Sequence, residues 1–249
     1  MHYKIKSGAF VVAVLSLSMT SCNKSNPTNN PTNPAWQTVF SDDFNRADGS
    51  IGANYSVQIY PDTGQFAGIF SVSNNMARLS RGSFYAIRYV TGVANEVVKV
   101  SVKCRIAAAP VSSYGLGVTV KSRSLGDTTW RSQEMYSGYV WVNGFPASTY
   151  TDSTPDSSSG IYRVSGIGLP APLISHAFVV KKGGSYLLEL TASNNVLTFV
   201  ATDLTSAFAE TLSVTDAGTA LTGTTVSING MQNAGDTTYF DDFKIEKYE

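Results

Sequence analysis

Apolar and polar residues alternate along most of the chain from Trp36 onward, and this period of two is typical of half-buried β-strands. The clearest stretch is residues 96–106 (EVVKVSVKCRI). Its apolar side carries Val98, Val100, Val102, Cys104 and Ile106. Lys, Ser and Arg residues occupy the other side. One side therefore faces a core and the other faces solvent, as expected of a strand in an antiparallel sheet. Cys104 falls on the apolar side, so we interpret it as a small core residue rather than a nucleophile.

Short turn signals separate the alternating stretches. Asn and Gly residues tolerate the positive φ angles that tight hairpin turns require. Such signals lie at residues 74–75, 143–144, 181–184 and 194–195. No stretch has a helical period of 3.6, and residues 205–210 predict one helical turn at most. Many short strands with regular turns predict an all-β sandwich or jelly roll that forms one domain over residues 36–249.

The N-terminus predicts export. Lys4 and Lys6 precede an apolar run at residues 9–17 that is too short to cross a bilayer as a helix. Residues 19–22 (MTSC) resemble a bacterial lipobox, which makes residues 1–21 a lipoprotein signal peptide and Cys22 the lipidated first residue of the mature chain. The alternative is an ordinary cleaved signal with an incidental cysteine. Residues 22–35 then form a lipidated, Asn/Pro/Thr-rich disordered tether without a large apolar side chain.

These features predict a lipid-anchored protein of the bacterial cell envelope. Acyl chains such as palmitate on Cys22 supply enough apolar surface for stable attachment, and we expect membrane contact through this anchor alone. The outer membrane is favoured, and the leaflet that faces the domain is left open, as is the oligomeric state. Without residues 1–21 the chain carries 16 basic and 18 acidic residues. A formal charge of −2 gives no electrostatic reason to bind nucleic acid.

A similar motif stands at both ends of the predicted domain, as FSDDF at residues 40–44 and YFDDF at residues 239–243. Together with residues 42–57, 71–79 and 186–203, these segments form an ordered series over most of residues 38–246. The series resembles a bacterial concanavalin A-like (laminin-G-like) jelly-roll domain. The resemblance implies a two-sheet antiparallel jelly-roll sandwich with the terminal strands adjacent in one sheet. It also implies frequent glycan binding or a structural calcium ion.

The sequence gives little support to catalysis. Glucanases of this fold carry Glu-x-Asp-x-x-Glu on one strand, and the chain has no such motif. Glu134 and Glu189 are isolated in sequence, although two strands can bring separate carboxylates together. His176 is the only histidine after the signal peptide and has no Gly-x-Ser-x-Gly partner motif, so we expect a surface or edge residue. The His/Cys clusters of a transition-metal site are also missing.

The paired aspartates pose a burial problem. Regular alternation places Tyr239, Asp241, Phe243 and Ile245 on one face of the last strand. It places Trp36, Phe40, Asp42 and Phe44 on one face of the first strand. An unpaired carboxylate among aromatic rings costs several kcal/mol. A bulge, backbone N–H groups or a bound cation would each resolve the cost, and the third option gives a candidate structural Ca²⁺ site. Its candidate ligands are Asp42, Asp43, Asp241 and Asp242.

A glycan site needs an aromatic ring beside polar side chains. Tyr139, Trp141 and Asn143 share one face of the strand GYVWVN, while Val140 and Val142 take the other. Further candidates lie nearby in sequence. They are Trp130, Tyr136 and Arg123. The alternative is that Tyr139 and Trp141 are ordinary sandwich core.

Three functional hypotheses follow. The first is an envelope lipoprotein whose lectin-like domain binds a polysaccharide without catalysis. The second is a glycan hydrolase or lyase with unrecognised catalytic residues. The third is a structural or adhesive surface protein.

Overall fold

The computed structural model describes most of the predicted domain. The described residues are 34–59, 70–79, 82–89, 96–106, 114–124, 133–142, 159–165, 171–176, 178, 180–181, 183–232 and 237–249. Residues Pro34–Glu249 form one compact unit of the chain. The signal peptide, Cys22 and nearly all of the predicted tether lie outside the described residues. A search of the described residues finds no helix long and apolar enough to cross a membrane.

The described part of the chain folds into β-strands, which agrees with the predicted all-β class. The strands are β1 (Trp36–Asp42), β2 (Gly49–Ser50), β3 (Ser56–Ile59), β4 (Phe70–Ser73), β5 (Met76–Leu79), β6 (Gly82–Tyr89), β7 (Val97–Arg105), β8 (Tyr114–Ser124), β9 (Gln133–Val142), β10 (Gly160–Ser165), β11 (Ile174–Ser175), β12 (Ser185–Ser193), β13 (Val196–Asp203), β14 (Ala209–Thr215), β15 (Thr225–Gln232) and β16 (Thr238–Tyr248).

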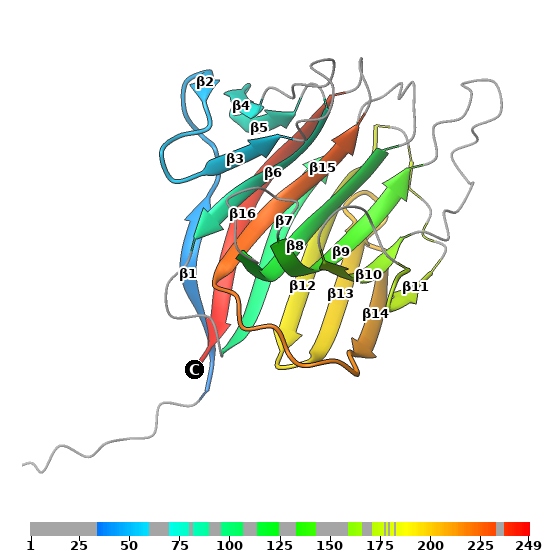
Figure 1. Cartoon of the computed structure of the whole chain (residues 1–249). Helices are drawn as coiled ribbons and strands as arrows, with labels where there is room; N and C mark the ends of the chain where they lie inside the picture. Colours follow the sequence, from blue (N-terminus) through cyan, green and yellow to red (C-terminus); the bar gives the residue numbers. More distant parts are fainter. Residues whose placement is uncertain are drawn as a thin grey trace, which may run out of the picture. The chain divides into compact units, whose positions relative to one another are not determined.

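The strands form two antiparallel sheets that pack face to face (Figure 1). The nine-stranded sheet has the order β14-β13-β12-β7-β16-β5-β4-β2, and β1 also pairs with β16. The seven-stranded sheet has the order β11-β10-β9-β8-β15-β6-β3. Residues 216–224 connect β14 of the first sheet to β15 of the second across one end of the sandwich (Figure 1). This arrangement confirms the predicted two-sheet antiparallel sandwich.

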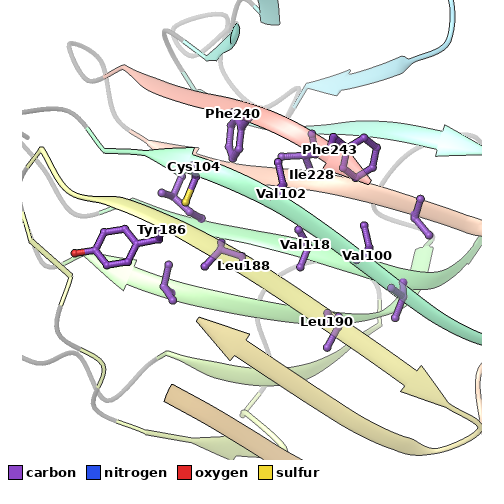
Figure 2. Close-up of a cluster of buried hydrophobic side chains, with 14 of the residues drawn as sticks. Val100, Val102, Cys104, Val118, Tyr186, Leu188, Leu190, Ile228, Phe240 and Phe243 are labelled. Carbon is purple, nitrogen blue, oxygen red and sulfur yellow. The ribbon is translucent and has the colours of Figure 1, made fainter. Parts of the chain in front are cut away.

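The core lies between the two sheets and is made by alternate residues of each strand. In β7, Val98, Val100, Val102 and Cys104 are buried, as the alternation predicts. They meet side chains of β8, β12, β15 and β16 (Figure 2). Burial of this apolar surface is the main favourable term that holds the sheets together. Cys104 is 2% exposed, which confirms the predicted core residue, and desolvation by burial raises the pKa of its thiol to about 12.

Two of the predicted hairpin turns are present with the expected backbone. Asn74 and Asn75 join β4 to β5 with φ angles of 55° and 58°. Asn194 joins β12 to β13 with a φ of 55°. Asparagine tolerates this left-handed region better than most residues, so these turns set the register of both hairpins. The turn predicted at residues 143–144 lies outside the described residues.

The described residues of the turn predicted at 181–184 have the expected backbone. The Gly184 amide donates to the Lys181 carbonyl oxygen at 3.0 Å, and Gly183 has a φ of 67°. Within the described residues, β11 is limited to Ile174–Ser175, and Phe178 makes an isolated bridge. The helical turn allowed at residues 205–210 is not formed, because residues 204–206 make a turn and β14 begins at Ala209.

The two terminal strands pair along their length, as the resemblance implies. Trp36 lies opposite Tyr248, and Asp42 lies opposite Phe243. The expectation of strict alternation is wrong in both strands, because each contains an irregularity. A bulge between Asp241 and Lys244 brings Phe240 and Phe243 into the core and leaves Tyr239 half-buried. An irregularity between residues 38 and 40 of β1 separates Trp36, which is exposed, from Phe40.

Candidate functional site

The outer face of the seven-stranded sheet carries a cluster of side chains that is separate from the sandwich core. In β9, Tyr136 and Val140 point into the core, whereas Met135 and Tyr139 belong to a second buried cluster with Tyr162 and Val164 of β10. The face assignment that placed Tyr139 opposite Val140 is therefore confirmed. The alternative of Tyr139 as ordinary sandwich core is wrong, because its ring lies on the opposite side of the sheet.

The Tyr139 ring lies over Gly117 of the neighbouring strand β8. A Cβ atom built on Gly117 would lie 2.6 Å from Cδ1 of Tyr139 and 2.4 Å from the Gly138 carbonyl oxygen. Glycine at position 117 thus makes room for the ring. The ring also packs edge to face on Tyr162, with centroids 5.9 Å apart. Both tyrosines are almost fully buried, so Tyr139 does not have the exposed ring face on which the sequence prediction depended.

Uncharged polar side chains continue the outer face beyond Tyr139. Ser137 of β9 lies opposite Thr119 of β8, which lies opposite Ser227 of β15. One step along the sheet, Asn229 lies opposite Gly117, which lies opposite Tyr139. We call Thr119, Ser137, Ser227 and Asn229 the polar row. All four side chains are buried.

Two members of the polar row have side-chain atoms without a hydrogen-bond partner. The Ser227 hydroxyl donates to Oδ1 of Asn229 at 2.8 Å, and the Thr119 and Ser227 hydroxyls form a short hydrogen bond. In the described part of the chain, Oγ of Ser137 and Nδ2 of Asn229 are buried and have no partner. Each such group costs about 1–3 kcal/mol. Unpartnered buried polar groups are rare in folded proteins and point to a water molecule or a ligand that completes them.

The described positions of this face in β8, β9, β10 and β15 carry no charged side chain that points outward. Lys121 lies at a bulge of β8 with a φ of 56°, and its Nζ donates to the Glu96 carbonyl oxygen at 2.6 Å. Glu96 precedes β7 in the other sheet, so Lys121 leaves the outer face. Burial lowers the pKa of Lys121 to about 8. The outer face therefore combines an aromatic side, at β9 and β10, with a neutral polar side at β8 and β15.

Arg123 and Tyr136, two of the residues predicted to contact a glycan, take part in a charged network instead. We call Arg123, Glu134, Tyr136, Arg163 and Asp216 the Arg163 network. Arg163 contacts a Glu134 oxygen at 2.7 Å and an Asp216 oxygen at 2.5 Å. Arg123 contacts the other Glu134 oxygen at 2.6 Å. Because Asp216 follows β14 of one sheet and Arg163 lies on β10 of the other, the network joins the two sheets at one end of the sandwich.

The prediction of Tyr136 as a glycan ligand is wrong, because its side chain is in the core and its hydroxyl donates to Asp216 at 3.0 Å. Burial, followed by this contact, raises the pKa of Tyr136 to about 12. Burial by itself would raise the pKa of Glu134, but hydrogen bonds from Arg163 and Arg123 outweigh it and leave that pKa below its usual value. Asp216 behaves in the same way, with the Gly218 amide, Arg163 and Tyr136 lowering its pKa. Two acids held as carboxylates suit a structural role better than proton donation.

The carboxylates of the first aspartate pair, Asp42 and Asp43, both accept hydrogen bonds from groups of the same chain. Asp42 accepts hydrogen bonds from Arg46 at 2.7 Å, from the Phe44 amide at 2.8 Å and from the Tyr55 hydroxyl at 2.8 Å. Burial by itself would raise the pKa of Asp42, and these hydrogen bonds lower it below the usual value. The Asp43 carboxylate accepts the Asn45 amide at 3.1 Å. Hydrogen bonding is thus the resolution of the burial problem at this end of the domain.

The bulge in β16 resolves the burial problem of the second aspartate pair, Asp241 and Asp242, because it turns their side chains away from the core. Asp242 has a φ of 47°, and its carboxylate lies 2.5 Å from Nζ of Lys103. Burial and the neighbouring charges of Asp242 and Asp43 raise the pKa of Asp241. Among the described residues, which include all four aspartates, no three His, Cys, Asp or Glu side chains are close enough to hold a metal ion. The four carboxylates are thus explained by internal contacts and do not assemble a calcium site.

A surface hollow of about 630 Å³ lies over this bulge on the nine-stranded sheet. Its lining includes Ser41, Asp43, Ser101, Leu187 and Lys244. Lys244 forms an ion pair with Glu246 at 2.7 Å, so this cation at the rim of the hollow already has an anionic partner. None of the described lining residues of the hollow offers an aromatic ring outside the core.

The remaining candidates are dispersed. His176 is exposed and contacts Glu210 at 2.8 Å, which agrees with the expected surface or edge residue. Glu134 lies in β9 and Glu189 in β12, so the two isolated glutamates belong to different sheets and form no catalytic pair. Trp130 and Asn143 lie outside the described residues, as does the side chain of Trp141, whose backbone lies opposite Gly115.

Sequence reasoning located the correct face of β9 but missed the polar row. The signal was present in β8 and β15, where Thr119, Ser227 and Asn229 alternate with core valines and isoleucines. Small polar residues at such positions usually indicate contact with solvent. Their burial depends on the tertiary structure and cannot be derived from the alternation. Arg163 and Asp216 were missed because they are far apart in sequence.

Comparison with known proteins supports the fold. No protein-family model matches the sequence, and no characterised protein matches it in sequence. The structure is similar to the CBM2 module of the evolved Dit of Lactobacillus casei BL23 phage J-1, with a TM-score of 0.60 and 13% identity over 87% of this chain and 98% of that chain. It is also similar to winged bean acidic lectin complexed with methyl-α-D-galactose. The TM-score is 0.52, and the identity is 11% over 86% of this chain and 100% of that chain.

A third similar structure comes from work on endo-acting O-glycanases of the human gut microbiota that initiate mucin breakdown. It has a TM-score of 0.50 and 10% identity over 84% of this chain and 98% of that chain. At these identities the similarity shows the fold alone. The fold is the two-sheet antiparallel sandwich of concanavalin A-like lectins and carbohydrate-binding modules.

Proposed function

We propose that this protein binds a carbohydrate without catalysis. The observation that carries the proposal is the two-sheet antiparallel sandwich, which the chain shares with a carbohydrate-binding module and with a galactoside-bound lectin.

The similar structures support a glycan as the ligand class. A carbohydrate-binding module and a lectin bound to a galactoside share this sandwich over nearly their whole length. The similarity to a glycanase structure keeps a glycan hydrolase as the alternative. Retaining and inverting hydrolases both need a pair of carboxyl groups at the scissile bond. The two glutamates considered as a catalytic pair, Glu134 of β9 and Glu189 of β12, lie in different sheets, which favours binding over hydrolysis.

The proposal includes the anchor. Cys22 is lipidated after removal of residues 1–21, and the tether to residue 35 connects the domain to the bacterial cell envelope, with the outer membrane favoured. The lipobox-like MTSC and the Asn/Pro/Thr-rich tether support this placement. A polysaccharide is then the natural partner of a domain held beside a cell surface.

Affinity electrophoresis against neutral and charged polysaccharides tests the binding function. We expect retardation of the wild-type protein by at least one polysaccharide.

Product analysis separates the alternative function. Release of reducing ends from a retarding polysaccharide by the wild-type protein would replace binding with hydrolysis. Absence of retardation by every polysaccharide would argue for the structural or adhesive hypothesis.

A further inference from the structure

The hollow over the β16 bulge lies on the outer face of the nine-stranded sheet. The neighbours of Ser101 along β7 are in the core, so Ser101 itself faces outward. Ser41 of β1 lies opposite Lys244 of β16, which lies opposite Ser101. Because directly opposed residues point to the same side of a sheet, these three side chains form one row of about 10 Å. Leu187 of β12 extends the lining of the hollow to a fourth strand.

Ser101 has a hydroxyl group that the protein does not use among the residues that the structure describes. The residue is only 8% exposed, although it lies on the outer face and lines the hollow. Its hydroxyl forms no hydrogen bond with any described residue. Polar side chains that are buried to this degree nearly always have a partner. The hollow is the space from which a partner reaches Ser101, so this hydroxyl points to a ligand there.

Two further groups of the lining are available to a ligand. One carboxylate oxygen of Asp43 accepts a backbone amide at 3.1 Å, and the other has no partner among the described residues. Lys244 has three N–H donors and directs one of them to Glu246, which also pairs with Lys99 at 2.8 Å. The hollow therefore offers an acceptor at Asp43, donors at Lys244 and a hydroxyl at Ser101 that donates and accepts.

The charges around the hollow cancel. Ion pairs with Arg46 and Lys103 neutralise two of the three aspartates that the structure describes in the lining. The third, Asp43, is offset by Lys244, because two lysines share the single carboxylate of Glu246. A charged ligand gains no net attraction from this arrangement and loses its hydration. A hydroxyl group finds both a donor and an acceptor, so a neutral, hydroxyl-rich ligand suits the hollow.

We propose that this hollow is the carbohydrate site and that it takes a neutral sugar, whose hydroxyl groups donate to Asp43 and form hydrogen bonds with Ser101 and Lys244. This inference rests on the proposed binding function and deepens it, because it gives that function a site and limits the ligand to uncharged glycans. Hydrogen bonds supply the affinity, and Leu187 supplies an apolar contact for the C–H groups of the sugar. A volume of about 630 Å³ is within the range of small-molecule sites.

The test compares wild type with Ser101→Ala and Ser101→Tyr. The probes are soluble β-glucan, mannan and galactan as neutral polysaccharides, with polygalacturonate and chitosan as charged ones. We expect wild type to bind a neutral probe and Ser101→Ala to bind it about fivefold more weakly, because one hydrogen bond to the ligand is lost. Ser101→Tyr should lose binding, because its ring fills the hollow. Thr198→Tyr is the matched control on the same face of β13, outside the described lining, and should bind as wild type.

Asp43→Asn tests the acceptor of the hollow. The variant keeps one oxygen for the backbone amide and replaces the other by an N–H donor, so it should bind the neutral probe about tenfold more weakly. Wild-type affinity should change by less than about twofold between about 0.05 M and about 0.5 M NaCl, since no ion pair forms with the ligand. A measurement that needs no variant is the shift of the Ser101 and Lys244 backbone amide signals in NMR spectra when the neutral probe is added.

Three results would overturn the inference and leave the proposed function intact. One is equal binding of the neutral probe by Ser101→Tyr and Thr198→Tyr, which would place the carbohydrate elsewhere and assign a water molecule to the Ser101 hydroxyl. Another is unchanged Ser101 and Lys244 amide signals in wild-type protein saturated with the probe. The third is wild-type binding to charged probes only. Absence of wild-type binding to any probe would remove both proposals.

Discussion

Arg163 links more of the molecule than any other single residue of its network. Its guanidinium contacts Glu134 of β9, Asp216 beyond β14 and the Thr219 carbonyl oxygen at 3.0 Å. A Cβ atom on Gly218 would lie 2.4 Å from the guanidinium, so glycine at this position permits the approach. One side chain thus fixes the segment that crosses the end of the sandwich.

Replacement of Arg163 by alanine should destabilise the domain by about 3 kcal/mol, because it leaves two largely buried carboxylates without their shared partner. Urea unfolding followed by tryptophan fluorescence measures the change. Arg123→Ala is the matched control, since Arg123 is half-exposed and its loss should cost less than about 1 kcal/mol. Equal losses in the two variants would show that Arg163 has no special role.

The same network should make stability fall in acid. The folded-state pKa values of Glu134 and Asp216 are below their usual values, so their contribution is complete above the unfolded-state pKa of about 4. It is lost as the pH falls through the lower folded-state values. Thermal unfolding between pH 5 and pH 3 should show a smaller decrease in Tm for Glu134→Gln than for wild type. Parallel decreases would contradict this assignment.

At the scale of elements, the bulge in β16 decides which side chains are buried. Asp242 adopts a φ of 47°, which is unfavourable for a residue with a Cβ atom. The extra residue shifts the alternation by one position, so that Phe240 and Phe243 are both buried. The position of Asp242 is explained by its backbone conformation and not by its charge, because the side chains of Asp242 and Lys103 are both half-exposed where they form their ion pair.

Asp242→Gly should therefore leave the stability unchanged or raise it by up to about 1 kcal/mol, since relief of the strained φ offsets loss of the surface ion pair. Asp242→Val should lower the stability by more than about 1 kcal/mol, because a β-branched residue resists positive φ. Denaturant unfolding of both variants measures the difference. If glycine were as damaging as valine, the contact with Lys103 would be the dominant contribution.

Sequence patterns predicted most of the strands and turns, but they predicted less well which side chains of each strand are buried. The alternation in β7 and the asparagine turns depend on neighbouring residues, so they could be derived directly. The bulge could not, because nothing in YFDDF distinguishes a regular strand from one with an extra residue. The burial of Tyr139 and Asn229 depends on what packs over the sheet, which a strand pattern does not contain.

At the scale of the whole molecule, the aspartates near the two ends of the domain have partners within the protein. Asp42 is held by Arg46 and Tyr55, and Asp242 by Lys103. We expect the Tm to be unchanged when EDTA is added and unchanged again when excess CaCl₂ follows, because only a ligand that binds the folded state shifts the unfolding equilibrium. A rise in Tm with calcium would restore the calcium hypothesis.

The pairing of β1 with β16 also fixes how the domain responds to force. Ala35 and Glu249 exchange two backbone hydrogen bonds, and the ladder continues from Trp36 opposite Tyr248 to Asp42 opposite Phe243. A pull on the chain before Pro34, directed along β1, loads these hydrogen bonds together in shear. A pull across the sheet breaks them one after another. The domain therefore has a strong and a weak mechanical axis, and tension along the first strand acts on the strong one.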